Sequence, residues 1–99
     1  MILARVVGTV VSTQKDSKMD ALRFMLVQPV DMNAKPTGVA VVAVDAVGSG
    51  PGEYVLFASG SSARQTTVTD QKPCDAVIMA IVDNWEVDGT VKYKKGQDD

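Results

Sequence analysis

Short apolar runs rich in β-branched residues alternate with polar segments that contain glycine or proline along the whole chain. The first run, residues 2–13, is rich in valine and threonine, and Gly8 within it indicates a bend or a bulge. Further apolar runs of strand length cover residues 22–28, 38–45, 54–59 and 75–83. Because turn-forming residues bound each run, the pattern predicts five strands.

Three segments allow more specific predictions. Pro29 is expected to end the second strand because proline has no backbone N–H to donate. Residues 38–45 are almost wholly valine and alanine, which predicts a strand buried on both faces. Serines at residues 61 and 62 favour a short helix over residues 63–65.

A small hairpin is predicted at the C-terminal end, where residues 85–87 and 91–93 flank an Asp-Gly-Thr segment. A three-residue loop would place Trp85 opposite Tyr93 and Val87 opposite Val91, so that apolar side chains gather on one face. Residues 94–99 are expected to fray.

Five short strands with little helical periodicity predict an all-β fold, either a small barrel or a sandwich. Closure into a barrel removes exposed strand edges, which makes it the favoured arrangement. The 99 residues are expected to form one domain, since two would each be too small for a good core.

Composition narrows the classes of function. The chain is 45% hydrophobic and 22% charged, which is typical of a folded globular protein, and its net charge of −2 argues against nucleic-acid binding. It has no apolar run of the about 20 residues needed to span a bilayer and no secretory signal pattern, so a cytoplasmic protein is expected. The single cysteine, Cys74, is interpreted as a structural residue without an internal disulfide.

Candidate catalytic chemistry is scarce. The chain has no histidine, which removes the commonest general base and metal ligand. The expectation is therefore a protein that is not an enzyme, with no catalytic, cofactor-binding or metal-binding residues. A small enzyme that uses Ser61 or Cys74 is the enzymatic alternative.

Two acidic residues differ from the others because they end strongly apolar runs. Asp45 and Asp83 are each expected to be partly buried, where a charge needs a partner. Each is interpreted either as a carboxylate positioned for binding or as a strand-end residue that accepts backbone N–H bonds from the next loop. The second interpretation is favoured.

Two further segments invite a binding interpretation. The glycine-rich residues 48–52 resemble a phosphate loop, but a strand-like segment follows them and no helix with a lysine does. Residues 60–64, Gly-Ser-Ser-Ala-Arg, place two hydroxyls and Arg64 near the predicted helix, where they would hold an anion or contact a neighbouring subunit.

Five blocks of sequence, at residues 5–13, 15–16, 44–48, 60–64 and 81–83, resemble the vertex proteins of bacterial microcompartment shells in order and spacing. These are the pentameric shell proteins of carboxysomes and of ethanolamine- and propanediol-using organelles. The resemblance covers residues 1–83 and leaves residues 84–99 as a C-terminal extension. Ser49, Gln14 and Ala21 depart from residues that are usual in the family.

The resemblance implies a five-stranded barrel related to the oligonucleotide-binding fold and a homopentamer that caps the five-fold vertices of a shell in the cytoplasm. Its implied partners are further copies of itself and hexameric shell proteins, with no nucleic acid, membrane or cofactor. The alternative is an oligonucleotide-binding module. The candidates for subunit or five-fold-axis contacts are Asp45, Val47, Gly48, Gly60, Ser61, Ser62, Ala63, Arg64 and Asp83.

Overall fold

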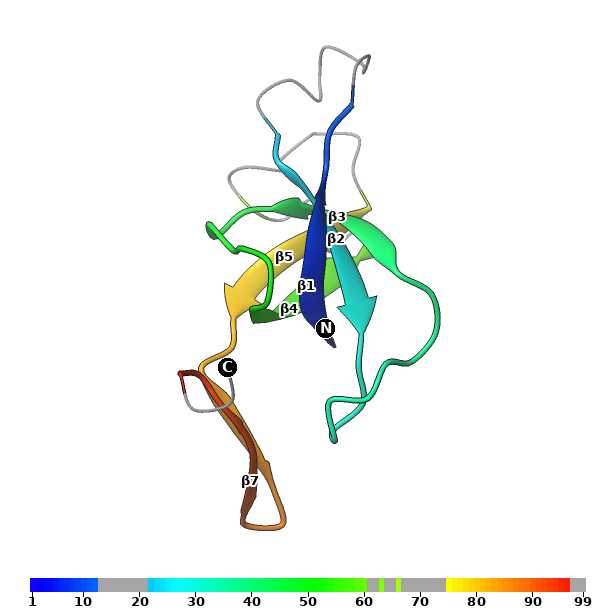
Figure 1. Cartoon of the computed structure of the whole chain (residues 1–99). Helices are drawn as coiled ribbons and strands as arrows, with labels where there is room; N and C mark the ends of the chain where they lie inside the picture. The colour runs from blue at the N-terminus through cyan, green and yellow to red at the C-terminus, as the bar shows by residue number, and fades with distance from the viewer. Residues whose placement is uncertain (13–21, 61–62, 64–65, 67–74, 97–99) are drawn as a thin grey trace.

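Five strands close into a barrel in the computed structural model, which describes residues 1–12, 22–60, 63, 66 and 75–96 (Figure 1). The order around the barrel is β1-β2-β3-β5-β4, and a separate two-stranded sheet joins β6 to β7. The strands are β1 (Ile2–Val10), β2 (Phe24–Pro29), β3 (Val41–Asp45), β4 (Tyr54–Ser59), β5 (Ala76–Ile81), β6 (Asn84–Val87) and β7 (Thr90–Lys94). The predicted all-β barrel is confirmed.

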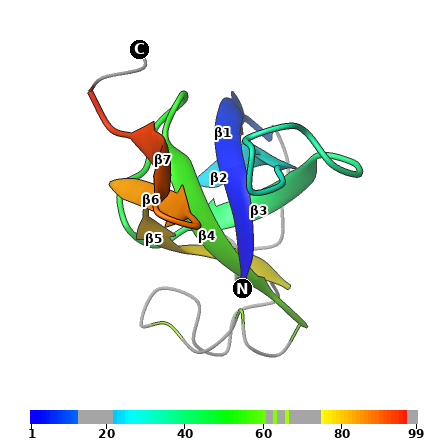
Figure 2. The same cartoon turned by 90° about the horizontal axis from the view of Figure 1, so that it is seen from below.

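Strand pairing is antiparallel around the barrel except between β3 and β5, which run parallel. The pairing of β1 with β2 shifts by one residue between Val6 and Gly8, so the bulge predicted at Gly8 is confirmed. Seen from below, the strands surround a common interior (Figure 2). Among the described residues, no helix is long and apolar enough to cross a membrane.

Alternate residues of the five strands fill the interior of the barrel. Phe57 is the largest side chain that is fully buried there. The interior cluster consists of Ala4, Val6, Met25, Val27, Ala43, Val55, Phe57, Ala76 and Ile78. Since side chains alternate between the faces of a strand, the neighbours of these residues point outward.

A second apolar cluster lies on the outside of β3, β4 and β5. Val44, Ala58 and Val77 alternate with interior residues, yet they are buried because Leu22 and Ala63 pack over them. The sequence predicted that the strand at residues 38–45 is buried on both faces, and this is confirmed for residues 43–45. It is wrong for residues 38–40, which precede the strand in an exposed connection, and for Val42, which points to solvent; Val41 is partly buried against the interior cluster.

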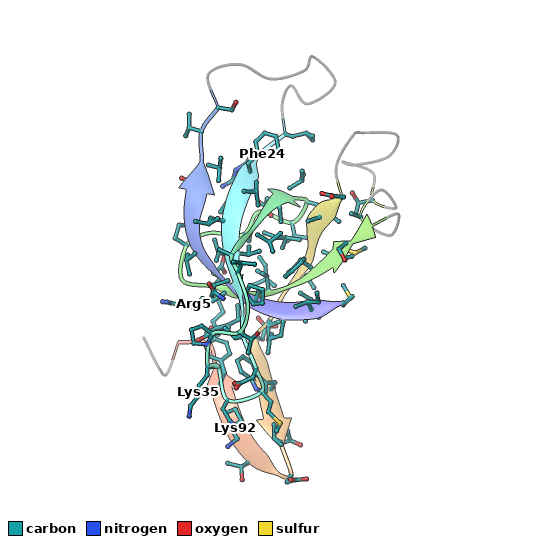
Figure 3. All side chains as sticks on the ribbon, turned by 90° about the vertical axis from the view of Figure 1, so that its right-hand side faces the viewer. Arg5, Phe24, Lys35 and Lys92 are labelled. Atoms are coloured by element: carbon teal, nitrogen blue, oxygen red, sulfur yellow. The ribbon has the colours of Figure 1, made fainter. Side chains whose placement is uncertain are left out.

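The C-terminal hairpin projects from the barrel, with Lys92 far from Phe24 at the other end of the molecule (Figures 1 and 3). Trp85 lies opposite Tyr93 as predicted, but Val87 pairs with Thr90, so the predicted pairing of Val87 with Val91 is wrong. The turn contains two residues, Asp88 and Gly89, whose φ values of 50° and 81° suit the tight turn typical of hairpins. A bulge after Trp85 then absorbs the one-residue difference.

Three aromatic rings anchor the hairpin to the barrel. Tyr54 of β4 lies 5.2 Å from Trp85 and 4.6 Å from Tyr93, measured between ring centroids. The indole N–H of Trp85 donates a hydrogen bond of 2.9 Å to the carbonyl of Met32. The chain remains ordered through Lys95, whose N–H donates to the carbonyl of Asp83, so the predicted fraying is wrong for residues 94 and 95.

Candidate functional site

Asp45 ends β3 with a carboxylate that is almost fully buried, its side chain being 1% exposed. One carboxylate oxygen, Oδ1, accepts hydrogen bonds from the Val47 N–H at 3.2 Å, the Ser49 N–H at 3.1 Å and the Ser49 hydroxyl at 3.0 Å. The other oxygen, Oδ2, accepts from Nη1 of Arg23 at 3.0 Å. The sequence favoured this arrangement, in which a carboxylate at the end of a strand accepts backbone N–H bonds from the next loop.

The network around Asp45 is internal to the subunit. Ser49 is itself buried, and the Arg23 side chain, which supplies the compensating charge, is 58% exposed. Both carboxylate oxygens are engaged by groups of the same chain, so Asp45 shapes the loop that follows it. Val47 and Gly48 are the exposed part of that loop.

The glycine-rich segment is a turn that returns the chain to β4. The N–H of Glu53 donates to the carbonyl of Gly50, and Gly52 adopts a φ of 91°, as the third residue of a turn with Pro51 before it requires. Its N–H groups are directed inward: that of Gly50 donates to the Glu53 carboxylate at 2.6 Å and that of Gly52 to the Val6 carbonyl at 2.8 Å. This arrangement favours a structural turn over phosphate binding.

The other candidate residues lie at separate places on the barrel. Gly60 follows β4 and donates its N–H to the carbonyl of Asp75, just before β5 begins, whereas Asp83 follows the end of β5. Asp83 is exposed, so its predicted partial burial is wrong, because β5 ends at Ile81. The length of β5, about 20 Å, thus separates Gly60 from Asp83.

The segment from residue 60 to residue 64 is described only in part. Ala63 is fully buried in the outer apolar cluster, and its side chain is therefore packed within the subunit. Ser61, Ser62 and Arg64 lie outside the described residues, as does Cys74. The predicted helix over residues 63–65 falls mostly outside them too.

An ion pair that the sequence did not reveal joins the barrel to the hairpin. Nζ of Lys95 lies 2.6 Å from Oε2 of Glu53, next to a hollow lined also by Arg5, Pro51, Gly52 and Tyr93. The hydrogen bond from Lys95 holds the pKa of Glu53 below its ordinary 4.5, and the same bond raises the pKa of Lys95 above 10.5. The two residues are 42 positions apart, and no local pattern pairs them.

Replacing Lys95 by methionine is expected to return the pKa of Glu53 toward 4.5, because the principal group that lowers it is removed. In the native protein, the contribution of Glu53 to stability is present above about pH 4.5 and is lost as the pH falls through its lowered folded-state pKa. NMR titration of the side-chain carboxyl measures the change. Lys94→Met, which removes an exposed neighbouring cation, is the matched control, and an unchanged Glu53 pKa in Lys95→Met would contradict the assignment.

Comparison with known proteins gives one consistent family. Residues 1–83 match the family model described as ethanolamine utilisation protein EutN/carboxysome. The carboxysome shell vertex protein CcmL of Gloeobacter violaceus is 43% identical over 95 residues, which are 96% of this chain and 95% of that protein. The microcompartment shell vertex protein EutN of Salmonella typhimurium is 37% identical over 96% of both chains.

Solved structures agree with the sequence matches. The structure of Gloeobacter violaceus CcmL superposes with a TM-score of 0.90 and covers 96% of this chain and 98% of that one, at 43% identity. The GrpN pentameric microcompartment shell protein from Rhodospirillum rubrum superposes with a TM-score of 0.80, at 39% identity, over 88% of this chain and 99% of that one.

Proposed function

Because the chain belongs to the EutN/carboxysome family, we propose that it is a structural shell protein whose homopentamers cap the five-fold vertices of a bacterial microcompartment. The observation that carries this proposal is the match of nearly the whole chain to proteins named as shell vertex proteins, in both sequence and fold. A microcompartment shell in the cytoplasm is accordingly its proposed location. The proposed pentameric state is supported by the structure of GrpN, which is described as a pentameric microcompartment shell protein.

The oligonucleotide-binding alternative finds little support in the aromatic residues. Such barrels stack bases on exposed aromatic rings beside a basic groove. Here the structure describes all five aromatic residues, and each of them is buried or partly buried. Tyr54, Trp85 and Tyr93 pack on one another to hold the hairpin, and Phe57 lies in the core. We therefore propose that nucleic acid is not a partner.

The proposed role is non-catalytic and requires no cofactor or metal. The relatives are named for a place in a shell, and the chain lacks histidine. The proposed partners are further copies of this chain and the hexameric shell proteins that surround a vertex. Residues 1–99 are proposed to act as one vertex-type unit, with residues 84–99 as its extension.

A native mass spectrum is expected to show an assembly of five times the 10.5 kDa chain mass, without a bound cofactor. A closed ring of five is the state that fits a five-fold vertex. Light scattering over a range of concentrations gives an independent mass. A chain that remains monomeric at every concentration would contradict the proposed function.

The sequence also suggested which residues contact neighbouring subunits or lie near the five-fold axis. We propose that the exposed Val47 and Gly48, positioned by the buried Asp45, and the segment from Gly60 to Arg64 lie at subunit contacts or near the five-fold axis, with Asp83 at a separate contact. In the same mass measurement, Arg64→Ala is expected to weaken assembly more than it weakens subunit folding. A variant that assembles fully would remove Arg64 from the contact set.

A further inference from the structure

An uncharged apolar row crosses the outer surface of β1, β2 and β3. Gly8 pairs with Leu26 and Leu26 pairs with Val42, so the three residues lie side by side. Val42 is 49% exposed, and Val7, the extra residue of the β1 bulge, is 47% exposed beside this row. We name Val7, Leu26 and Val42 the front row.

A second uncharged apolar row crosses β1, β4 and β5. Leu3 pairs with Leu56 and Leu56 pairs with Ala80. These residues point outward because their neighbours Ala4 and Val55 are fully buried in the interior. All three remain partly exposed in the subunit, and we name Leu3, Leu56 and Ala80 the back row.

The two rows differ from the outer cluster around Val44 and Val77. That cluster is buried within the subunit because Leu22 and Ala63 pack over it. In the front row, Val7 and Val42 are about half exposed and Leu26 is partly exposed, and apolar side chains of this kind gain stability when they leave water. An aliphatic partner surface would remove the exposed side chains of both rows from water.

We propose that the front row of each subunit packs against the back row of the next subunit in the ring. This inference rests on the proposed function, because a closed ring of identical subunits requires two unlike faces on each one. The rows are centred on β2 and β4, which are separated by β1 in the barrel order, so they face different directions. Two such faces generate a ring, whereas one self-complementary face would generate a dimer.

The surroundings of the rows suit an interface with an apolar centre and a polar rim. Arg5 lies between the rows along β1 and points outward from the barrel (Figure 3). It pairs in register with Gln28 on one side and Tyr54 on the other. A standard interface buries about 800 Å² on each partner, so these polar side chains would be included at its edge.

Single substitutions test each row separately. Val42→Glu in the front row and Leu56→Glu in the back row are each expected to convert the pentamer to monomers, because each would bury an unpaired carboxylate at the contact. Ala80→Glu is a second back-row variant, which introduces the carboxylate without removing a large apolar side chain from the subunit. Val91→Glu, at a hairpin position that is 59% exposed and outside both rows, is the matched control and is expected to remain pentameric.

Mixing the two kinds of variant tests whether the rows face each other. A Val42→Glu subunit retains an intact back row, and a Leu56→Glu subunit retains an intact front row. An equimolar mixture is therefore expected to form a dimer with one copy of each, at twice the 10.5 kDa chain mass, and to stop there because the remaining faces are blocked. Native mass spectrometry distinguishes this dimer when one variant carries an isotope label.

The outcomes distinguish the pairing of the two rows from the proposed function. The inference is overturned if Val42→Glu or both back-row variants stay pentameric with native circular dichroism. It is also overturned if folded monomers of both kinds form no mixed dimer, because the rows would then not oppose each other. In either case the proposed function still stands if the wild-type protein is pentameric. A monomeric wild-type protein would contradict the proposed function itself, whatever the row variants do. If the row variants remain pentameric but are not incorporated into a shell, the rows would instead contact the hexameric shell proteins.

Discussion

Replacing Asp45 by alanine is expected to lower the free energy of unfolding by about 2–4 kcal/mol, because several buried groups lose their acceptor together. The Ser49 N–H and hydroxyl and the Val47 N–H all donate to this carboxylate, and Ser49 is buried. A buried donor without an acceptor costs more than an average hydrogen bond contributes. The loop that displays Val47 and Gly48 is expected to lose its conformation as well.

The matched control for Asp45→Ala is Arg23→Ala. The Arg23 side chain is 58% exposed, so its ion pair is screened by water, and Arg23→Ala removes only the donor to Oδ2 while the three hydrogen bonds to Oδ1 remain; the expected loss is therefore smaller than that of Asp45→Ala. Urea unfolding at one fixed protein concentration measures both variants, since assembly adds to the apparent stability. Equal losses for the two variants would show that the ion pair, and not the network around Ser49, carries the stabilisation.

The barrel could be predicted because its determinants are local in sequence. β-branched runs separated by glycine and proline indicated strands, and the observed β4 matches the predicted range of residues 54–59. Gly8 indicated the bulge for the same reason, since glycine weakens regular strand structure. The start of β3 and the end of β5 were predicted less well, because apolar residues lie beyond the strand at both points and tertiary contacts alone decide the boundary.

The hairpin shows how one local choice changes a register. The Asp-Gly-Thr segment allowed loops of two or three residues, and the positive φ values of Asp88 and Gly89 select the shorter one. A one-residue change in the loop moves Val91 opposite Glu86, and Val91 becomes exposed. The pairing of Trp85 with Tyr93 persists because the bulge compensates.

The site was only partly predictable. The position of Asp45 at the end of an apolar run predicted its hydrogen bonds to the following loop, because those partners are near in sequence. Its bond to Arg23 and the ion pair between Glu53 and Lys95 join residues that are 22 and 42 positions apart. Contacts of that kind depend on how the barrel closes, and a single sequence carries no local signal for them.

The substitution Phe57→Ala is expected to lower the free energy of unfolding of the subunit by about 3–5 kcal/mol, because it removes the largest buried side chain of the core. Small domains have total stabilities of about 5–15 kcal/mol, so this loss is a large share. Phe57 also lines a hollow of about 500 Å³ together with Ile2 and Val41. The new cavity would be lined by apolar side chains of the interior cluster, and because such cavities stay dry, the lost packing is not replaced by contacts with water.

Assembly is expected to rescue the Phe57→Ala subunit in part. A ring binds only folded subunits, so mass action stabilises the folded state more strongly as the protein concentration rises. The melting temperature of Phe57→Ala, followed by circular dichroism, is therefore expected to increase with concentration and to stay below that of the wild type at each one. Phe57→Leu, which keeps an apolar side chain, is the control and should lose far less. A melting temperature of Phe57→Ala that does not change with concentration would show that folding and assembly are not coupled in this protein.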